Sequence, residues 1–583
     1  MPPLRTLRLS ALGALCALLV ALPAGAQSPP LFTHGVGCGE PTSGDVVLWT
    51  RTAAASTLVP ELLDAQGGVL RSLPSVQTTA ETDFTIKTIA ADLAPGASIR
   101  YRFRGPSGEL SPVGTCHTAP PADQAVPFTF AFSGDADWKW RPYPVLNALN
   151  GESLDFFIFL GDTIYETTNL AGTKVVEDLA GYRAKYRENR ELPQGLPNDP
   201  GADVPLRDLY ASFGMFSVPD NHELGTSVDD PKAPRYTEGG APAAPGSAQP
   251  LVNKTTGFDD RMRAYLEYQP LRDRLVQGTG DVRLDGTRRL YFSQTWGAAA
   301  RLIMVDDRSY RDIRLPNSDD PRVDDPNRTI LGAPQLAWLE NELAGAQADG
   351  VTWKFVVISS PIQHIGRASE IGVDLDGSKS WAGGYRVERD RLLKFIDDQG
   401  IDNVVFLTTD NHNTMINNLR YRQVPEDQAS PLVPARNAFE ILTGPLGAGF
   451  GYPVKADLTG LSGRLAERRV AETLVGLVPN PDGVLRGQLQ GGVDPLGLEP
   501  ATVDVVPASV QAEGGQPGLV EPEAFASFNT FTYAVLSVDG PTLSVRVQGQ
   551  PGVDPLQILD PATLATYAQT PSHTILQFQV QAR

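Results

Sequence analysis

Two different patterns of apolar and polar residues follow one another along the chain. From Phe32 to about Pro120, short apolar-rich runs are separated by glycine, proline and aspartate, and this pattern is typical of a β-sandwich. The clearest of these runs are Val46–Thr50, Phe84–Thr88 and Ile99–Phe103. Beyond residue 125, wholly apolar runs end in acidic or polar residues and alternate with helical segments. This second pattern predicts a layered α/β domain whose strands are covered on both faces.

The α/β region has a regular series of predicted elements. We predict buried strands at Phe128–Phe132, Phe156–Leu160, Leu302–Val305, Lys354–Ile358 and Asn403–Leu407. We predict helices at Tyr182–Arg190, Gln335–Leu343 and Val387–Gln399. Near the C-terminus, a return to sheet is predicted at Phe531–Val538, Leu543–Val547 and Thr574–Val580, whereas the Gly/Pro-rich stretch 457–524 fits no element. Ligands in α/β sheets collect beyond the ends of strands, so the residues that follow these strands are the candidates for chemistry.

The first 26 residues carry the pattern of a signal peptide. Arg5 and Arg8 precede the apolar run Ala11–Leu22, and Ala24–Ala26 is an A-x-A cleavage site, so the exported chain is predicted to begin at Gln27. No later stretch offers about eighteen consecutive apolar residues, so no integral membrane segment is expected. We therefore expect a periplasmic or secreted protein.

Charge and cysteine content narrow the possible partners. The formal net charge of −19 becomes −21 once Arg5 and Arg8 leave with the signal peptide, which disfavours a nucleic-acid partner. An acidic protein can still bind a phosphate ester where bound cations reverse the local field. Cys38 and Cys116 remain after export and are predicted to form a disulfide, with two unrelated buried thiols as the alternative. Any metal must then be held by oxygen and nitrogen ligands.

Acidic side chains follow the first two strands of the α/β region. Asp135 comes after Gly134, which lets the backbone turn sharply at the end of the first strand. Asp162 follows the second strand, and Tyr165 stands three residues further on, so that a carboxylate and a phenol can face one ion. A phenolate suits a hard trivalent metal such as iron. Taken singly, these patterns also fit a turn, or a helix cap above a core tyrosine.

Two later segments combine acids, amides and histidines. Asn221 offers a neutral carbonyl oxygen to a metal, and His222 beside it offers a proton to a leaving-group oxygen. Asp410 and His412 stand two residues apart beyond a buried strand, so both can point toward the same ions. His364, which follows another buried strand, fits a metal ligand and an ordinary hydrogen-bonding histidine equally well. Four such loops in one α/β domain predict a shared site on rigid strand ends.

Taken in order, these segments resemble the calcineurin-like metallophosphoesterase signature, in which a first aspartate site is followed by GDxxD or GDxxY, GNHE and a closing GHxH. The chain resembles the PhoD-like alkaline phosphatase family more closely. The segments that carry this resemblance are Gly35–Pro41, Val47–Arg51, Gly161–Glu166, Asp220–Glu223, Val305–Arg311, Leu331–Leu339 and Thr409–His412. They extend from about residue 32 to residue 450, which is most of the chain.

Three positions depart from the residues that this family usually carries. Gly134 stands where PhoD-like chains usually place a cysteine that helps to hold iron, and Asp135 next to it follows the wider superfamily. Thr409 replaces a glycine, and Asn221 stands where PhoD-like chains commonly carry aspartate. These departures leave the identity of the metal open among iron, calcium, manganese and zinc.

The resemblance implies a four-layer α/β metallophosphoesterase sandwich preceded by an all-β Ig-like domain. The implied organisation is a signal peptide at 1–26, an Ig-like β-sandwich at 30–120, and a catalytic domain with a C-terminal extension at 125–583. Two or more metal ions are expected as cofactors. The expected ligands are Asp162 between two ions, Asp135, Tyr165 and His412 on one ion, and Asn221, Asp410 and the further candidate His364 on the other.

The implied mechanism is attack on phosphorus by a hydroxide shared between the two ions, with His222 protonating the departing alkoxide. The predicted function is that of an exported, metal-dependent phosphoesterase acting on small-molecule phosphate esters. Phosphodiesterase or phospholipase D-type activity at the same centre is an alternative, because monoester and diester hydrolysis share this chemistry. A secreted binding protein on a decayed hydrolase scaffold is a second alternative, motivated by Gly134 and Thr409.

Overall fold

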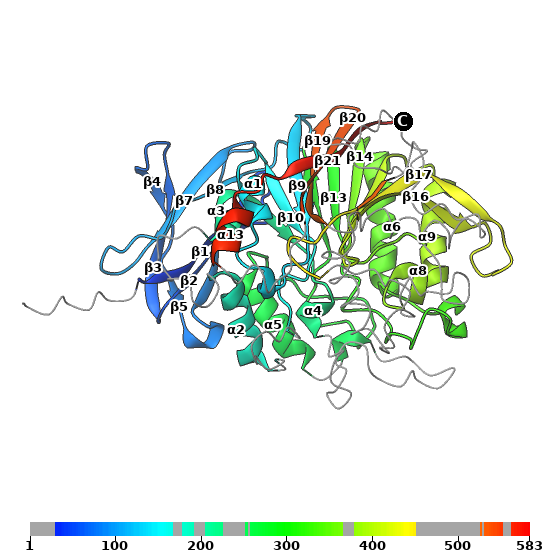
Figure 1. The fold of residues 1–583 in the computed structure, drawn as a ribbon, viewed down its shortest axis with the longest axis horizontal. Helices are drawn as coiled ribbons and strands as arrows, with labels where there is room; N and C mark the ends of the chain where they lie inside the picture. Colours follow the sequence, from blue (N-terminus) through cyan, green and yellow to red (C-terminus); the bar gives the residue numbers. More distant parts are fainter. Residues whose placement is uncertain are drawn as a thin grey trace, which may run out of the picture.

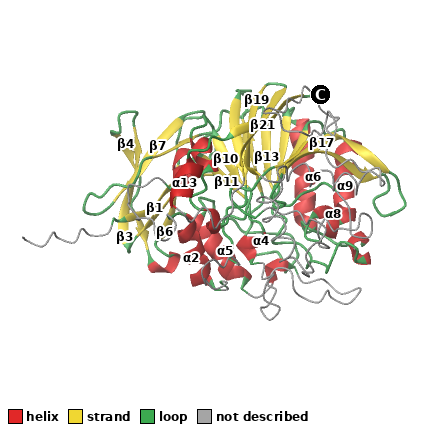
Figure 2. Cartoon of the chain, viewed as in Figure 1, coloured by secondary structure: helices red, strands yellow, loops and turns green. Residues whose placement is uncertain are grey.

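The structure is a computed structural model that describes residues 30–166, 176, 178–191, 204–225, 251–254, 257–364, 378–449, 525–527, 530–551 and 561–583. The predicted signal peptide and the unassigned stretch 457–524 lie outside the described residues. Two large β-sheets occupy the centre of the molecule, and the N-terminal strands, drawn in blue, lie at one end (Figure 1). In the view of Figure 2, some helices lie below the strands and others lie beside them.

The first large sheet contains nine strands in the order β21-β20-β19-β9-β10-β11-β1-β2-β6. Their bounds are β1 Phe32–Gly39, β2 Val46–Thr52, β6 Thr85–Ala90, β9 Phe128–Ser133, β10 Phe156–Phe159, β11 Gly214–Ser217, β19 Thr530–Asp539, β20 Thr542–Pro551 and β21 His573–Gln581. The neighbours from β9 to β1 are parallel, whereas the remaining pairs are antiparallel. The three C-terminal strands thus join this sheet beside β9. The sequence predicted their return to sheet but not the sheet that they join.

The second large sheet contains seven strands in the order β12-β13-β14-β15-β17-β16-β18. Their bounds are β12 Phe292–Trp296, β13 Ala300–Met304, β14 Trp353–Val357, β15 Val404–Thr408, β16 Thr414–Arg422, β17 Leu432–Leu442 and β18 Phe525–Ser527. The run β13, β14, β15, β17 is parallel. Each strand predicted for the α/β region coincides with a strand of one of these two sheets.

Alternation of side chains along the strands produces the layers. In β9, Phe130 and Phe132 belong to the core between the two sheets, whereas Ala131 between them belongs to the core under the outer helices. In β13, Leu302 faces the same inter-sheet core and Ile303 faces the helices over the second sheet. Because successive side chains of a strand point to opposite faces, a strand buried on both faces is apolar throughout. The resulting order of helix, sheet, sheet and helix agrees with the predicted four-layer α/β fold.

The helices divide between the two outer faces and the edge of the sandwich. α1 (Val145–Asn150) and α3 (Pro205–Ser212) pack on the nine-stranded sheet, and α6 (Ala333–Ala348) and α9 (Arg386–Asp398) pack on the seven-stranded sheet. The other helical elements are α2 Leu179–Asn189, α4 Asn221–Leu224, α5 Phe258–Tyr268, α8 Trp381–Gly384, α13 Pro561–Ala568, η1 Ala80–Thr82, η2 Trp138–Trp140, η3 Val252–Lys254 and η4 Pro321–Asp324. Of the helices in the described ranges, none combines the length and the apolar character that a membrane span requires.

The N-terminal strands divide between two sheets. The strands β3 Ser56–Leu63, β4 Val69–Ser72, β5 Val76–Thr78, β7 Ser98–Arg104 and β8 Gly114–His117 form a small sheet of their own. In contrast, β1, β2 and β6 extend the nine-stranded sheet, because β1 pairs with β11 and Cys38 lies opposite Gly214. This segment is thus rich in strands, as predicted, but it shares a sheet with the α/β region. Its description as an Ig-like domain stays a prediction.

A disulfide joins Cys38 in β1 to Cys116 in β8, with the two Cα atoms 6.4 Å apart. The predicted bridge is therefore confirmed. It ties β1, an inner strand of the nine-stranded sheet, to the small N-terminal sheet, and both cysteines belong to one apolar core.

Candidate metal centre

The ends of parallel strands from both sheets meet at one edge of the sandwich. Beyond β9 and β10, the amide of Asp135 donates to the carbonyl of Gly161 at 3.1 Å. Beyond β15 and β14, the amide of Thr409 donates to the carbonyl of Ser359 at 3.0 Å. The amide of Gly447, which follows β17, donates to the carbonyl of Asp135 at 3.0 Å and so links the two sheets. The loops beyond both sheets therefore form one connected surface.

Four of the candidate residues at this edge have a left-handed backbone. Their φ angles are +64° at Asp135, +48° at Asp162, +70° at Asp410 and +53° at His412. Residues other than glycine rarely adopt this conformation, and aspartate and histidine are among the types that tolerate it best. Backbone strain of this kind gathers at functional sites, where the surrounding structure enforces it. These strained positions therefore point to a shared chemical role.

The first cluster consists of Asp135, Asp162, Tyr165 and His412. The phenol oxygen of Tyr165 lies 2.8 Å from His412 Nε2 and 3.4 Å from Asp135 Oδ1. His412 Nε2 lies 3.4 Å from the same Oδ1, and ligand atoms of both residues lie within 4.8 Å of a carboxylate oxygen of Asp162. His412 Nδ1 donates to the carbonyl of Gly449, which leaves the lone pair of Nε2 facing the cluster. Three oxygens and one nitrogen thus converge on one point.

Thr409 fixes the carboxylate of Asp135 within this cluster. Its hydroxyl donates to Asp135 Oδ2 in a buried hydrogen bond, so that Oδ1 is the oxygen turned to Tyr165 and His412. A Cβ atom added to Gly134 would lie 3.0 Å from Thr409 Cγ2 and 3.1 Å from Thr409 Oγ1. The side chain of Thr409 therefore takes up the space beside Gly134, and two departures from the PhoD-like pattern lie in contact with each other.

The second cluster consists of Asp162, Asp220, Asn221 and Asp410. Carboxylate oxygens of its three aspartates lie within 4.8 Å of one another. Asn221 begins α4, and its amide donates to Asp220 Oδ1 at 2.8 Å. The other oxygen of Asp220, Oδ2, is buried and has no hydrogen-bond partner among the described residues. A buried carboxylate oxygen without a donor is what a cation site offers. Asp162 belongs to both clusters.

Two basic side chains reach the second cluster. Arg308, which is 1% exposed, forms an ion pair with Asp220 Oδ1 and donates to Asp410 Oδ2 at 3.1 Å. Lys379 Nζ lies 3.1 Å from Asn221 Oδ1 and donates to Asp410 Oδ1. Asp410 is thus held by a guanidinium on one oxygen and by an ammonium on the other.

The pKa values of the shared carboxylates follow this distribution of charge. Burial raises the pKa of Asp162 well above its usual range, and repulsion from neighbouring carboxylates, Asp220 foremost, adds to the increase. Burial raises the pKa of Asp220 as well. Burial alone would raise the pKa of Asp410, but Lys379 and Arg308 more than offset it and lower that pKa. An additional cation near Asp162 would relieve the repulsion that the raised pKa reflects.

His222 lies beside Asp162 at the mouth of the site. Its amide donates to Asp162 Oδ1 at 2.9 Å, and its Nε2 lies 3.9 Å from Asp162 Oδ2. Nδ1 lies 2.5 Å from Glu166 Oε2, and the ring packs on Tyr165 with centroids 4.0 Å apart. These contacts fix the ring so that Nε2 faces the carboxylate that both clusters share.

Glu223 anchors the loop that carries Asp162. Its carboxylate accepts from the amides of Asp162 at 2.9 Å, Thr163 at 2.5 Å and Asp220 at 2.7 Å. The last of these bonds is half of a capping box at the start of α4, where the Asp220 side chain is the N-cap. Glu223 therefore holds the β10 and β11 loops in a fixed relation without being part of either cluster.

The structure brings most of the predicted ligands together. The predicted ligands that lie in the two clusters are Asp135, Asp162, Tyr165, Asn221, Asp410 and His412. His364 follows β14 and belongs to neither close group of acids and histidines, so its role as a ligand stays a prediction. Sequence reasoning did not single out Asp220, Arg308 or Lys379. Asp220 and Arg308 lie inside the segments that resemble the family, whereas Lys379 lies between Ser378 and Ser380 and belongs to no motif.

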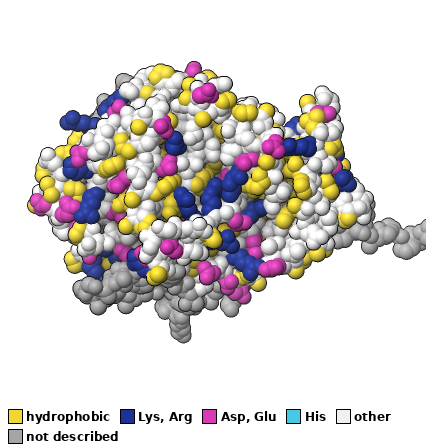
Figure 3. All heavy atoms as spheres, turned by 180° about the vertical axis from the view of Figure 1, so that it is seen from behind, with side chains coloured by type: hydrophobic (Ala, Val, Ile, Leu, Met, Phe, Trp, Pro, Cys, Tyr) yellow, Lys and Arg dark blue, Asp and Glu magenta, His cyan; other side chains and the backbone are white. Residues whose placement is uncertain are grey.

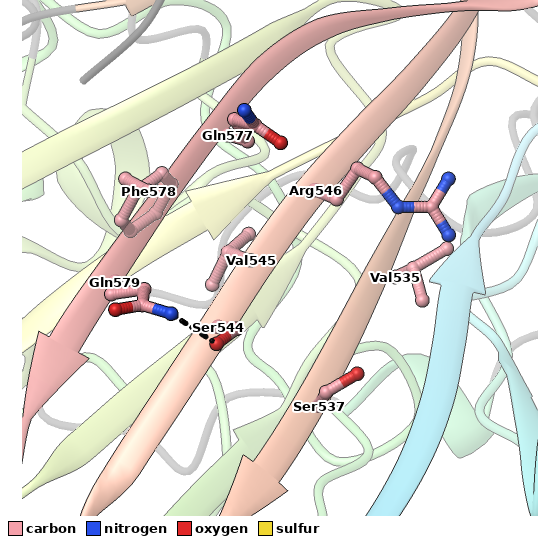
Figure 4. Close-up of a pocket in the computed structure, with 8 residues that line it drawn as sticks. All are labelled: Val535, Ser537, Ser544, Val545, Arg546, Gln577, Phe578 and Gln579. Atoms are coloured by element: carbon pink, nitrogen blue, oxygen red, sulfur yellow. Dashed lines mark hydrogen bonds between the residues drawn. The ribbon is translucent and has the colours of Figure 1, made fainter. Parts of the chain in front are cut away.

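Other surface features lie on different residues. A cavity of about 400 Å³ on β19, β20 and β21 is lined by Val535, Ser537, Ser544, Val545, Arg546, Gln577, Phe578 and Gln579 (Figure 4). Gln579 donates to Ser544 within it, and Arg546 is paired with Glu152 outside it, so these polar groups already have partners. On the face shown in Figure 3, basic side chains lie intermixed with acidic and apolar ones. The two acidic clusters are therefore the better candidate for chemistry.

Comparison with known families gives two matches along the chain. The family described as PhoD-like phosphatase matches residues 128–480, and the family described as PhoD-like phosphatase, N-terminal domain, matches residues 19–120. The first match includes both clusters and His222. The second includes all strands of the small N-terminal sheet and both cysteines.

Individual proteins give the same picture. The chain is 29% identical over 436 residues to alkaline phosphatase D of Bacillus subtilis (strain 168), an alignment that covers 67% of this chain. The chain spans 65% of the length of that relative. A solved structure described as "Structure of PhoD" matches with a TM-score of 0.66 and 22% identity, covering 95% of this chain and 91% of the other. At that identity the likeness concerns the fold.

Proposed function

The chain belongs to the PhoD-like phosphatase family, and we propose that it hydrolyses phosphate esters with a pair of cations held by the two clusters. The observation that carries the proposal is the position of Asp162, whose carboxylate lies within ligand distance of both groups of side chains. A carboxylate in that position can hold two ions at once. Two-metal hydrolases use such an arrangement to clamp a phosphoryl group.

The donor atoms fit hard cations. The first cluster would hold one ion with Asp135, Tyr165 and His412, and its phenol and imidazole favour iron or another transition metal. The second cluster offers oxygen atoms, which favour calcium or manganese. Asp220 Oδ2 supports the fit, because it has no hydrogen-bond partner in the part of the chain that the structure describes and a cation would satisfy it.

The residues around the two clusters have separate roles in the proposed reaction. When bound, the cations supply a water of lowered pKa and neutralise the oxygens of the phosphoryl group. Asp162 fixes the spacing of the two sites, and Glu223 fixes Asp162. His222 Nε2 donates a proton to the leaving oxygen as its bond to phosphorus breaks and the oxygen of water bonds to phosphorus. Glu166 keeps the His222 ring in the orientation that this transfer needs.

The proposed substrates are small-molecule phosphate monoesters, as the name of the relative, alkaline phosphatase D, suggests. The test is the rate of release of nitrophenol from nitrophenyl phosphate and from its bis-ester, measured on the full chain before and after removal of metal with a chelator. The proposal expects faster release from the monoester, loss of turnover with the chelator, and recovery when iron, calcium or manganese is restored. Equal turnover with and without metal contradicts it, and so does a protein that binds no metal and turns over neither ester.

We infer further that the protein is exported. The disulfide between Cys38 and Cys116 supports this inference, because such bonds persist in oxidising compartments. Mass spectrometry of the protein recovered from the periplasm or the medium should give a chain that begins at Gln27. Recovery of the uncleaved chain from the cytoplasm with both thiols reduced would contradict it.

A further inference from the structure

Lys379 holds two oxygen atoms that the proposed function assigns to a cation. Its Nζ donates to Asn221 Oδ1 at 3.1 Å and to Asp410 Oδ1. The side chain of Lys379 is 25% exposed, whereas that of Asp410 is 2% exposed. The ammonium therefore reaches from the entrance of the site to the oxygens at its base.

The backbone around Lys379 is fastened in place. Its carbonyl accepts from Arg311 at 3.2 Å and from Arg308 at 3.5 Å. The preceding Ser378 hydroxyl accepts from Arg314 at 2.7 Å, and the following Ser380 caps α8. Because the main chain is held on both sides, a change in the position of the ammonium requires only rotation along its flexible stem.

Arg308, the other basic residue of the second cluster, is more deeply buried than Lys379. Its guanidinium is 1% exposed and holds the outer oxygens, Asp220 Oδ1 and Asp410 Oδ2, together with the carbonyl of Lys379. Arg308 is therefore shielded from solvent, whereas the side chain of Lys379 is partly exposed. Arg308 is thus a permanent charge of the second cluster, and Lys379 is the charge that can be displaced.

We propose that Lys379 competes with the second cation for Asn221 Oδ1 and Asp410 Oδ1, and that the displaced ammonium then binds the phosphate group of the substrate. An ammonium and a metal ion cannot both occupy the space between these two oxygens. The partly exposed position of Lys379 lets the displaced ammonium stay at the entrance, where an anionic ester must pass. Cation and phosphate then assist each other's binding, because each removes the cost of moving the lysine.

This inference rests on the proposed two-cation function, and metal binding tests it apart from activity. The full chain, freed of metal by a chelator, is titrated with Mn²⁺ in a calorimeter. In Lys379→Met, the more weakly bound Mn²⁺ should bind at least about tenfold more tightly than in the wild type, because no ion pair has to be broken first. Lys379→Arg retains the charge and should not show this gain. Circular dichroism verifies that each variant is folded.

A second experiment measures how strongly the protein binds phosphate. With both sites saturated by Mn²⁺, inorganic phosphate should inhibit Lys379→Met about five- to tenfold more weakly than the wild type, and KM for nitrophenyl phosphate should rise by more than kcat falls. Addition of phosphate should tighten Mn²⁺ binding less in Lys379→Met than in the wild type. Lys394→Met is the matched control, because Lys394 pairs with Asp398 on the exposed face of α9 and should change none of these values.

The outcomes separate the two proposals. Wild-type and Lys379→Met proteins with equal Mn²⁺ affinity would overturn the inference and leave the two-cation function in place. Weaker Mn²⁺ binding in Lys379→Met would overturn it too, since the lysine would then assist the cation. A wild-type protein that binds no Mn²⁺, iron or calcium would overturn the proposed function together with the inference.

Discussion

The two clusters share Asp162 and yet balance their negative charge in different ways. In the first, Asp135 is contacted by a hydroxyl, a phenol and an imidazole, and no lysine or arginine of the described residues forms a salt bridge with it. In the second, Arg308 and Lys379 already pair with the carboxylates. The negative charge of the first cluster therefore depends on a bound cation for its compensation. In the second cluster, Arg308 and Lys379 already compensate part of the negative charge.

This difference predicts different affinities for metal. A cation entering the first cluster meets one imidazole and several oxygens that Thr409, Gly449 and the strand ends hold in position. A cation entering the second cluster has to displace an ammonium from two of its ligands. We expect one tightly bound ion in the first cluster and one exchangeable ion in the second.

The largest effect is expected for the residue that both clusters share. Asp162→Asn should lower kcat/KM by more than about a thousandfold, because a neutral amide cannot serve two cations. The same variant should be at least as stable as the wild type in chelator, since the raised pKa of Asp162 shows that its charge destabilises the metal-free fold. Thermal unfolding and steady-state kinetics measure the two effects, with the exposed Asp398→Asn as control. Near-normal turnover by folded Asp162→Asn would show that the two clusters do not depend on a shared Asp162 carboxylate.

Variants specific to one cluster should separate the two ions. Changes in residues behind metal ligands typically cost about ten- to a hundredfold in metal affinity, and loss of a ligand should cost at least as much. Tyr165→Phe should therefore release the tightly bound ion while the exchangeable ion still binds, and Asn221→Ala should do the reverse. Elemental analysis after dialysis gives the tight ion and calorimetry gives the exchangeable one. If either variant loses both ions equally, the clusters do not act as separate sites.

A smaller effect is expected behind the first cluster. Thr409→Val keeps the shape that fills the space beside Gly134 but loses the hydrogen bond to Asp135, so affinity for the tight ion should fall by about tenfold. Thr409→Ser keeps the hydroxyl and should stay close to the wild type. The exchangeable ion should be unaffected in both variants. Equal metal affinity in Thr409→Val and Thr409→Ser would show that the hydroxyl does not position Asp135.

The smallest effect is a dependence of stability on pH. Burial raises the pKa values of Asp162, Asp220 and Glu223, so the metal-free folded form keeps protons that the unfolded form has released, and stability should decline as pH rises above the ordinary carboxyl range. The lowered pKa of Asp410 acts in the opposite direction, because its contribution is present above its ordinary pKa and lost as pH falls.

Bound cations should flatten this decline, since they compensate the three carboxylates whose pKa values are raised. The measurement is Tm from about pH 5 to about pH 9, once in chelator and once with Mn²⁺. We expect the Tm in chelator and the Tm with Mn²⁺ to diverge as pH rises. Parallel curves would show that the raised pKa values have no connection with metal binding.

The sequence predicted the parts of the fold that depend on burial alone. The run Phe156–Phe159 is apolar throughout because both faces of β10 are covered, and this makes it readable as a strand. β16 and β17 were not predicted, because buried polar residues interrupt them. Asn417 lies in β16 and Glu440 in β17, and Asn417 Nδ2 donates a hydrogen bond to Glu440 Oε2 at 2.7 Å. Only the folded chain brings these two residues together.

In the site, too, the sequence predicted the residues that directly follow buried strands but not those that only the folded chain brings close. Asp135, Asp162 and Asp410 follow buried strands, so their positions could be read from the pattern. Arg308 and Lys379 contact these acids from loops beyond other strands, and an arginine or lysine in a loop has no pattern that distinguishes it from a solvated one. The pairing of β1 with β11, which joins the N-terminal segment to the large sheet, likewise depends on residues far apart in the chain.

The most direct test of the central claim is the anomalous diffraction of crystals of the full chain soaked in Mn²⁺. We predict two peaks on either side of the Asp162 carboxylate, one among Asp135, Tyr165 and His412 and the other among Asp220, Asn221 and Asp410. We also predict that Lys379 Nζ has left Asn221 and Asp410 in the soaked crystal. Peaks that avoid Asp162, or no peak at either cluster, would contradict the central claim.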